Sequence, residues 1–585
     1  MRVNIIGAGL AGLSAAVRLA QMNIASALIS VQTSERAQSV LAEGGINAAM
    51  NVSGENDTAQ EHFEDTMRGG VCLADPVAVR GLTQEAPVIV RELLDLGVPF
   101  NMEGDALVQR RFGGQKKTRT TYARSSTGKA LMTAMIDAAR RYENTEQPLI
   151  LRYPHHRFQE LILENGVCEG VRLQDTYTEK WIDLAGPVIL AFGGPNGLFP
   201  GRTTGTTAND AGGLATVFAQ GVELANLEFI QYHPTTVQIS GKRMLISEAA
   251  RGEGGRLYVM RGGQKWYFME EKYPELGNLM PRDVVSREMD AILRDPECQP
   301  PVLLDLTGLP KKTWQKRLPD LRKEIRHYLD IDPARQPVPV SPGIHFFMGG
   351  ILVDHEHRTN IPNLYAAGEC ACQYHGANRL GGNSLLGALY GGRVAAQSIA
   401  KQGSAARDTA EQSIAKQGFT VQGSGAQSIV KKGVETPGAA AQNSTEAMVK
   451  TSAGSETLPA DSSDFSAAGA EELARILSKG LGIVRDEAGI DEALGELAAF
   501  GQKLQQSGKR TEAEKRRLKL AEAMLLCARA RKESRGAHTR ADFPARDDDN
   551  WQKTTTAVFK EGKIHISFRE ISGTGITRTH TIENN

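Results

Sequence analysis

Val3-Asn-Ile-Ile6-Gly7-Ala-Gly9-Leu-Ala-Gly12 is the stretch that decides the fold of this 585-residue chain, and Leu13–Ala20 follows it directly. Its first four residues are a short apolar run typical of a buried strand, and the residues from Leu13 to Ala20 favour a helix. A glycine-rich turn between a strand and a helix lets backbone N–H groups and the helix N-terminus face a pyrophosphate. The stretch therefore predicts a Rossmann-like α/β domain that binds a dinucleotide.

The second apolar run, Ala27–Val31, carries Ser30 near its end. Nicotinamide dehydrogenases place an acidic residue at this position, where it binds the ribose hydroxyls. This run carries the hydroxyl of Ser30 there instead. The missing acid argues against a nicotinamide dehydrogenase.

Length and composition set broad limits on function. A chain of 585 residues predicts several domains with an ample core. Lys plus Arg and Asp plus Glu both number 68, so no large net charge attracts the protein to nucleic acid or to an anionic membrane. The six cysteines form no CxxC pair, which argues against a zinc site or an iron–sulfur cluster in this chain. Reduced thiols fit a cytoplasmic protein, and we expect no metal site.

The N-terminus superficially resembles a signal peptide, because Arg2 precedes an apolar stretch and small residues. The glycines and the strand that begins at residue 2 favour the dinucleotide-binding interpretation instead. No apolar run approaches the roughly 18–20 residues that span a bilayer. We therefore expect any membrane association to come through another subunit.

Five further motifs combine glycines or a proline with side chains that bind or protonate anions. A guanidinium on a glycine-rich turn, for example, suits bidentate capture of a carboxylate. In chain order the motifs are Phe229-Ile-Gln-Tyr-His233-Pro-Thr, Ser247-Glu248-Ala-Ala-Arg251-Gly-Glu-Gly-Gly, Pro281-Arg282-Asp-Val-Val-Ser-Arg287, His345-Phe-Phe-Met-Gly-Gly and His375-Gly-Ala-Asn-Arg379-Leu-Gly-Gly-Asn-Ser384-Leu385. Together and in this order they resemble the flavoprotein subunit of the succinate dehydrogenase and fumarate reductase family, in particular its Gram-positive branch.

The resemblance implies an α/β fold: a Rossmann-like FAD-binding domain with an inserted α+β capping domain, followed by a C-terminal helical domain. The expected boundaries are 1–230 and 345–400 for the FAD-binding domain, 231–344 for the capping domain, 401–464 for a flexible insertion, 465–552 for the helical domain and 553–585 for a strand-like tail.

The resemblance also implies which residues bind FAD. Ala42-Glu43-Gly44-Gly45 matches the segment that passes the flavin ring, and Asn209-Asp210-Ala-Gly matches an element near the flavin. Glu369 would bind ribityl hydroxyls, and Ser384 and Leu385 would place backbone N–H groups at the pyrimidine end of the flavin. The full set of expected cofactor residues is Gly7, Gly9, Gly12, Ser30, Glu43, Gly44, Gly45, Gly193, Gly194, Asp210, Glu369, Ser384 and Leu385.

Gln38 is the main departure from the family. Membrane-bound members carry a histidine at this position that is covalently joined to the flavin, and no histidine occurs between residues 1 and 61 of this chain. We therefore expect non-covalent FAD. Because covalent attachment tends to raise the flavin potential, its absence favours fumarate reduction over succinate oxidation.

A 1,4-dicarboxylic alkene needs cations or hydrogen-bond donors at each carboxylate, a hydride source and an acid. By resemblance His345 and Arg379 would hold one carboxylate and His233 and Ser247 the other, with the flavin N5 between them. The Phe-Phe-Met that follows His345 departs from the Tyr-Thr-Met of many relatives and leaves the shape of the pocket open.

Arg282 stands at the family's proton-donor position, and Glu248 with Arg251 would form the relay to solvent. An arginine is almost always protonated and is a poor acid by itself. It can donate a proton if the loss is coupled to Glu248 and the acceptor is a strongly basic carbanion.

The predicted function is FAD-dependent interconversion of fumarate and succinate, biased to fumarate reduction, with hydride transfer from flavin N5 and arginine as the proton donor. The alternatives are an L-aspartate oxidase and a non-enzymatic FAD-binding electron-transfer or redox-sensing subunit. Expected partners are a small dicarboxylate and, from other chains, an iron–sulfur subunit and a membrane anchor, but no nucleic acid. The expected location is the cytoplasm, or the inner face of the cell membrane through those subunits.

Ala395-Ala-Gln-Ser-Ile-Ala-Lys-Gln-Gly recurs with variations at Ala410 and Gly425, a period of 15 residues. The copies are rich in Ser, Gly, Ala and Gln, which predicts the flexible insertion and leaves partner docking as an alternative. Beyond it, Thr511-Glu-Ala-Glu514 predicts a helix N-terminus, with Leu518, Ala521, Leu525 and Ala528 on one face. Ile564, Ile566 and Phe568 alternate and predict a strand.

Overall fold

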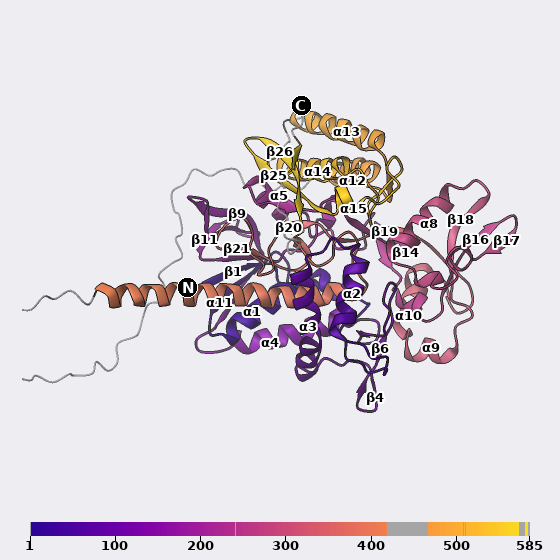
Figure 1. Cartoon of the computed structure of the whole chain (residues 1–585), viewed down its shortest axis with the longest axis horizontal. Coiled ribbons are helices and arrows are strands. Elements are labelled where there is room, and N and C mark those ends of the chain that lie inside the picture. The colour runs from indigo at the N-terminus through magenta and orange to yellow at the C-terminus, as the bar shows by residue number, and fades with distance from the viewer. Residues whose placement is uncertain are drawn as a thin grey trace, which may run out of the picture.

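The computed structural model describes residues 2–239, 241–417, 466–506, 508, 511–571 and 580–582 (Figure 1). At its centre lies a five-stranded parallel sheet of order β21-β12-β1-β2-β8. Its strands are β1 (Arg2–Ile6), β2 (Ala25–Ser30), β8 (Ile150–Pro154), β12 (Val188–Leu190) and β21 (Leu364–Ala366).

The two faces of this sheet pack against different layers, because successive side chains of a strand point to opposite sides. Ile5, Leu28 and Ile189 are in register and pack on the helical layer, whereas their neighbours Ile6, Ile29 and Leu190 pack on the other side. The helical layer comprises α1 (Leu10–Gln21), α3 (Pro76–Asp95), α4 (Thr127–Glu143) and α11 (Asn383–Gln417), and the core on the opposite face includes the meander β9 (His156–Glu164), β10 (Val167–Asp175) and β11 (Trp181–Ala185).

The predicted strand–turn–helix at the N-terminus is present as β1 and α1. Helix α1 begins at Leu10, three residues earlier than Leu13, so two of the three glycines precede the helix and Gly12 lies in its first turn. A Cβ on Gly7 (φ +118°) would overlap the carbonyl oxygen of Ala191, and one on Gly12 would overlap that of Gly7. Only glycines allow this close approach of helix and strands.

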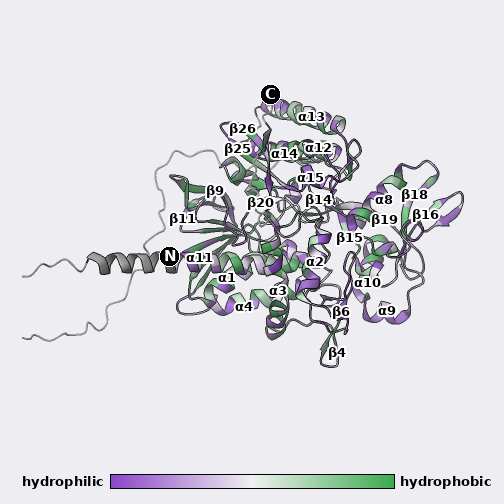
Figure 2. Cartoon of the chain, in the orientation of Figure 1, coloured by the Kyte–Doolittle hydropathy of each residue, from purple (hydrophilic) through white to green (hydrophobic). Residues whose placement is uncertain are grey.

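A second body carries its own sheet and core. The sheet has the order β15-β14-β19-β18-β16-β17, and Figure 1 shows it as the lobe on the right. Its strands are β14 (Ile230–Ile239), β15 (Lys242–Leu245), β16 (Arg256–Arg261), β17 (Gln264–Trp266), β18 (Cys298–Asp305) and β19 (Val338–Phe347), joined by the helices α6 (Ala249–Gly252), α7 (Phe268–Lys272), α8 (Arg282–Arg294), α9 (Lys311–Lys316) and α10 (Pro319–Leu329). Figure 2 shows hydrophilic residues at the tip of its β16–β17 hairpin and hydrophobic ones in the central strands.

The C-terminal part contains α12 (Ala467–Gly480), α13 (Glu487–Gln506) and α14 (Glu512–Ala530). The capping box predicted at Thr511 and Glu514 is confirmed, and the predicted apolar face of α14 is buried. The predicted strand is β26 (Lys563–Glu570), which pairs with β25 (Lys553–Lys560). Through β25 these strands extend a sheet that contains β13 (Leu224–Ala225) and β20 (Gly350–Leu352), so the tail is built into the body of the molecule.

Helix α11 continues through residues 401–417, which were expected to begin the flexible insertion. The Ala, Gln and Lys residues there are good helix formers, which explains the extension. The rest of that prediction, residues 418–464, lies outside the described residues. Among the helices that the structure describes, none has the length and apolarity to cross a bilayer.

Candidate active site

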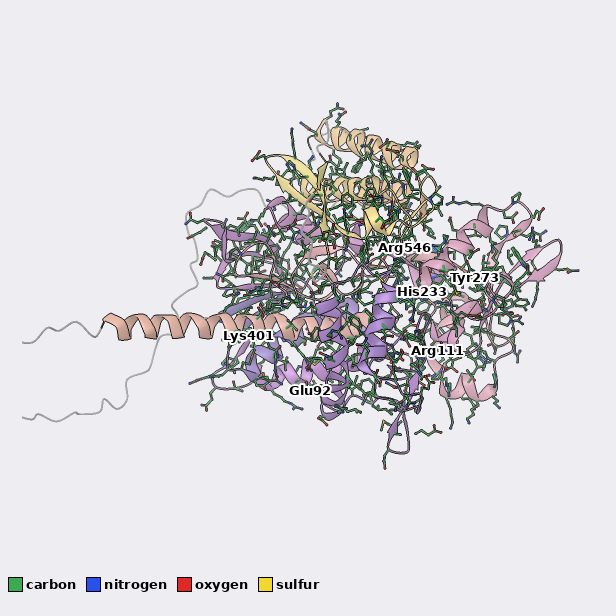
Figure 3. All side chains as sticks on the ribbon, in the orientation of Figure 1. Glu92, Arg111, His233, Tyr273, Lys401 and Arg546 are labelled. Carbon is green, nitrogen blue, oxygen red and sulfur yellow. The ribbon has the colours of Figure 1, made fainter. Side chains whose placement is uncertain are left out.

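One long cavity of about 510 Å³ collects the predicted site residues from all parts of the chain. Of the twenty candidates only Gly12 and Arg251 do not line it, and both lie directly behind residues that do. The lining candidates are Gly7, Gly9, Ser30, Glu43, Gly44, Gly45, Gly193, Gly194, Asp210, His233, Ser247, Glu248, Arg282, His345, Glu369, Arg379, Ser384 and Leu385. Figure 3 labels His233 where the right-hand lobe joins the rest of the molecule.

One end of the cavity has the features of a dinucleotide site. Gly9 is the N-cap of α1 and offers no side chain, which leaves the first turn of the helix open to an anion. Ser30 ends β2 beside this turn. Ser384 and Leu385 form the first turn of α11 and line the same cavity. The glycine turn, the helix N-terminus and the hydroxyl therefore fit a pyrophosphate and ribose.

Glu43 and Gly45 form a tight wall in the middle of the cavity. Gly45 has φ +139°, and a Cβ there would lie 2.6 Å from the carbonyl oxygen of Thr121. Burial raises the pKa of Glu43 well above its ordinary value. Its Oε2 atom is buried without a hydrogen-bond partner among the residues that the structure describes. A buried carboxyl with an unused oxygen fits a polar group of a bound cofactor.

Gln38 also lines the cavity, in the short 3-10 helix Gln38–Leu41. Its Oε1 atom accepts a hydrogen bond from the backbone N–H of Thr206 at 2.6 Å. The side chain therefore links two segments of the cavity wall at the position where family members attach the flavin.

Glu369 and Gly194 are in direct contact. A Cβ on Gly194 would lie 2.6 Å from Glu369 Oε1, which accepts the backbone N–H of Phe347 at 3.2 Å. Burial raises the pKa of Glu369 to about 7. This carboxyl can therefore change its protonation state near neutral pH.

Asp210 is held by arginines that sequence reasoning did not identify. Its Oδ2 accepts Arg157 Nη1 at 2.9 Å and Arg517 Nη2 at 2.7 Å, and its Oδ1 accepts the N–H of Gly212 at the start of α5 (Gly212–Ala219). Arg517 comes from α14, so the C-terminal part supplies a wall of the cavity. Nothing local in the sequence indicates this pairing.

The two histidines face each other at the other end of the cavity. His233 on β14 and His345 on β19 have ring centroids 5.1 Å apart. His345 Nδ1 lies 2.8 Å from Thr204 Oγ1. Burial, reinforced by the charge of Arg282, lowers the pKa of both histidines well below the ordinary value. They are neutral imidazoles that act as hydrogen-bonding groups.

Arg282, at the start of α8, is bound by a buried carboxylate. Its Nε and Nη2 donate to Glu248 Oε2 at 2.8 and 2.6 Å. Burial alone would raise the pKa of Glu248, but the charges of Arg282 and Arg251 outweigh it and the pKa is lowered. Arg251 Nη2 lies 3.6 Å from Glu248 Oε1, on the side away from Arg282. The three residues form one buried chain of charges.

Gln231 is a residue that sequence reasoning missed. Its Oε1 accepts both Arg282 Nη1 and Arg379 Nη2 at 3.0 Å, and its Nε2 donates to Asn378 Oδ1 and to the carbonyl oxygen of Arg379. The sequence did contain a signal for it, because Gln231 lies two residues before His233 on β14. Side chains two positions apart in a strand point to the same face. Phe346 was also missed, and its ring lies 4.3 Å from the Arg379 guanidinium carbon.

This end of the cavity has a surplus of positive charge. Arg251, Arg282 and Arg379 are buried beside the ionised carboxylate of Glu248, and Glu369, with a pKa of about 7, is only partly ionised at neutral pH, so positive charge is in excess in this cluster. Burial and then the charge of Arg282 lower the pKa of Arg379 well below its ordinary value. A small dianion would compensate these charges. The fold and the cavity thus define a dinucleotide-binding protein with an anion site beside its cofactor.

Comparisons with known proteins agree with this interpretation of the fold and the cavity. The family described as "FAD binding domain" matches residues 2–385, and "Fumarate reductase flavoprotein C-term" matches residues 470–582. The succinate dehydrogenase flavoprotein subunit of Bacillus subtilis (strain 168) is 35% identical over 94% of this chain and 93% of that protein. An L-aspartate oxidase of Nostoc sp. is 37% identical but covers 66% of this chain and 65% of that protein. A solved structure of an E. coli quinol fumarate reductase variant superposes with a TM-score of 0.81 at 27% identity, covering 98% of both chains.

The chain therefore belongs to the succinate dehydrogenase and fumarate reductase flavoprotein family. It is a flavoprotein with FAD as its cofactor and an oxidoreductase that acts on CH–CH groups. The α/β FAD-binding fold with a C-terminal helical part is confirmed. The residue boundaries of the domains and the individual site roles stay predictions.

Proposed function

We propose that the protein interconverts fumarate and succinate. The observation that carries the proposal is the buried excess of positive charge in the cofactor cavity, which suits the negative charges of a dicarboxylate. The Bacillus subtilis and E. coli proteins are named for these reactions and share nearly the whole length of the chain.

The site residues divide into two carboxylate-binding groups. Arg379 and the neutral His345 bind one carboxylate, and the neutral His233 and the hydroxyl of Ser247 bind the other. Arg379 supplies the charge-assisted hydrogen bonds, which are about twice as strong as neutral ones. This asymmetry orients the alkene between the two ends.

The cofactor, when bound, supplies hydride chemistry, and we assign the proton to Arg282. Arg282 Nη1 and Nη2 face the cavity edge, where Gln231 and Glu248 hold the guanidinium. Glu248 is buried and ionised, so after turnover it can accept a proton from the solvent side and pass it on to Arg282. Arg251 lies at the far side of Glu248 and forms the outer member of this relay.

Glu43, Glu369 and Asp210 hold FAD together with the glycine turns, and Gln38 cannot form the covalent bond of the membrane-bound members. Non-covalent FAD has the lower potential, and we therefore assign fumarate reduction as the favoured direction. Iron–sulfur and membrane-anchor subunits, as in a quinol fumarate reductase, would deliver electrons and hold the chain at the inner face of the membrane.

L-aspartate oxidase is the second candidate, because a relative of that name shares about two thirds of the chain. The C-terminal match at residues 470–582 favours fumarate and succinate. A non-enzymatic role is disfavoured because Arg282, Arg379 and the two histidines of the site all line the cavity.

The deciding experiment is an assay of the purified holoenzyme with a reduced viologen dye. Fumarate should oxidise the dye faster than succinate reduces the corresponding acceptor, and L-aspartate with oxygen should give no hydrogen peroxide. Aspartate oxidation without fumarate turnover would establish the second candidate. A larger succinate rate would contradict the assigned direction.

A further inference from the structure

The loop that carries Arg379 is held from two sides, and one side belongs to the C-terminal part of the chain. The backbone N–H of Ala377 donates to the carbonyl oxygen of Gly70 at 2.9 Å, and the Ala377 carbonyl oxygen accepts the N–H of Ala537 at 2.9 Å. Ala377 is fully buried in an apolar cluster with Phe229, Phe346 and Ala537. Phe346 in turn lies against the Arg379 guanidinium.

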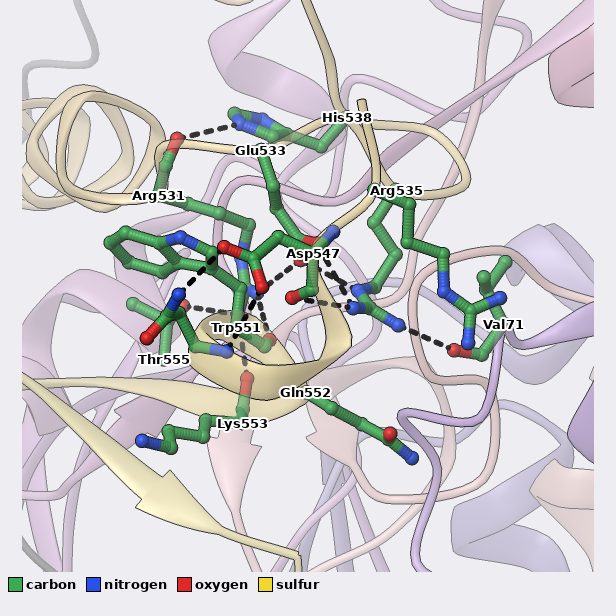
Figure 4. A network of polar contacts seen from close by, with 12 residues as sticks. Val71, Arg531, Glu533, Arg535, His538, Asp547, Trp551, Gln552, Lys553 and Thr555 are labelled. Atoms are coloured by element: carbon green, nitrogen blue, oxygen red, sulfur yellow. Dashed lines mark hydrogen bonds and ion pairs between the residues drawn. The ribbon is translucent and has the colours of Figure 1, made fainter. Parts of the chain in front are cut away.

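The turn on the other side of the loop is strained. Val71 (φ +53°) and Cys72 (φ +56°) are consecutive non-glycine residues in the left-handed region, which side chains of L-residues disfavour. The C-terminal part holds this turn as well, because Arg535 Nη1 donates to the Val71 carbonyl oxygen at 3.0 Å and Gln552 Nε2 to that of Cys72 at 3.2 Å. Figure 4 shows Arg535 reaching Val71 from the C-terminal segment.

Arg535 is itself fixed by a buried ion network. Glu533 accepts Arg535 Nε at 2.6 Å and Arg531 Nη1 at 3.0 Å, and all three side chains are fully buried. Arg531 Nε also binds Glu228 at 2.7 Å, two residues before β14, the strand that carries Gln231 and His233. One segment, Arg531–His538, thus contacts both the loop that carries Arg379 and Glu228, which directly precedes the strand with Gln231 and His233.

We propose that the segment Arg531–His538, together with Gln552, positions the dicarboxylate site. It sets the place of Arg379 through Ala377 and the place of Gln231 and His233 through Glu228. The proposal rests on the proposed function, because it takes Arg379 to be a carboxylate-binding residue. None of the residues of the segment lines the cavity, so they act as positioning residues.

Gly536 allows a sharp test. It has φ +54°, and a Cβ there would lie 2.6 Å from the Ala377 carbonyl oxygen, two residues before Arg379. Gly536→Ala should therefore push the loop away from its place. Gly562→Ala is the matched control, because Gly562 has φ +79° and no atom within 4 Å of a new Cβ. Both variants acquire left-handed strain, but only one presses on the Arg379 loop.

The measurement is titration of the flavin absorbance of each holoenzyme with malonate, together with Tm and the KM and kcat for fumarate. Gly536→Ala should raise the malonate Kd about tenfold or more, since a misplacement of about 1 Å at a positioning group has large effects. KM should rise more than kcat falls, and Gly562→Ala should change only Tm. Equal Kd values for the two variants would overturn the proposal.

If Gly536→Ala does not retain FAD, Gln552→Leu decides. It removes only the hydrogen bond to Cys72, so the malonate Kd should rise about twofold or more at unchanged FAD content, and an unchanged Kd would overturn the proposal. A wild-type protein that binds no dicarboxylate would refute the proposed function instead. In that case hydrogen exchange of the backbone amides of residues 375–379 tests the positioning directly. Gly536→Ala should accelerate this exchange and Gly562→Ala should not. Equal exchange rates in the two variants would contradict the positioning role.

Discussion

Arg379→Gln separates substrate binding from chemistry. The substitution removes a buried guanidinium from the anion-binding end of the cavity and leaves a neutral side chain. Arg379 uses Nη2 to reach Gln231, while its Nε has no partner within the described part of the chain. The remaining donors can bind a carboxylate, and hydrogen bonds to charged groups contribute about 1.5–3 kcal/mol each.

Two effects determine the expected size of the loss. Losing the carboxylate contacts weakens binding directly, and removing the repulsion from Arg282 stabilises the empty site and so weakens binding further. We expect a net loss of about 2–4 kcal/mol, which raises the Kd for a dicarboxylate about 30- to 700-fold. The empty protein should keep its Tm or gain stability, because a buried, incompletely compensated cation is removed.

Arg282→Gln is the matched comparison. A general acid acts in the transition state, so turnover should fall about 10²–10⁴-fold while the malonate Kd changes by less than about tenfold. Titration of the flavin absorbance with malonate, measured beside dye-linked turnover, distinguishes the two arginines. If Arg282→Gln loses binding as severely as Arg379→Gln, or keeps near-normal turnover, the assignment of Arg282 as the proton donor is wrong.

Three further expectations concern the cofactor, the repeats and pH. Because Gln38 cannot attach the flavin, acid precipitation should release all yellow colour, and flavin fluorescence on the denatured band would contradict this. Deletion of residues 403–462 should preserve FAD content and Tm, since Ser/Gly/Ala/Gln repeats add little core; a large drop in Tm would show that they pack. Burial raises the pKa of Glu369 from 4.5 to about 7, so its contribution to apoprotein stability is present below pH 4.5 and is lost as pH rises through about 7. The Tm of Glu369→Gln apoprotein should fall less across that window than the wild-type Tm in calorimetry, and parallel slopes would refute the assignment.

Local sequence signals predicted the parts of the fold that depend on neighbouring residues. The β1–α1 unit and the capping box at Thr511 and Glu514 are examples, because their glycines and caps act within a few residues. The ends of elements were harder to predict. Helix α1 begins three residues early, and α11 continues to Gln417 through residues that are good helix formers. Such boundaries depend on contacts that no local pattern contains.

The candidate site was predicted where a motif carries a charged or reactive side chain, and was missed where a residue works through distant partners. Gln231 contacts Arg379 across 148 positions, and Arg517 contacts Asp210 across 307. A neutral glutamine in a strand has no charge pattern to distinguish it. An arginine on a helix is usually a solvent-exposed side chain, and only the docking of α14 shows that this one lines the cavity.

The arrangement of buried charges explains why the site draws on three parts of the chain. Arg282 and Arg379 share one acceptor, Gln231 Oε1, so two like charges are held close together. Such repulsion tends to push apart the two elements that carry these arginines, and only a rigid scaffold can hold them in place. The helix α8 carries Arg282, a glycine-rich loop carries Arg379, and the ion network of Glu228, Arg531 and Glu533 anchors the strand and loop behind them. A dianion that enters between the arginines relieves the repulsion that the scaffold resists, so the same geometry that destabilises the empty site favours its occupation.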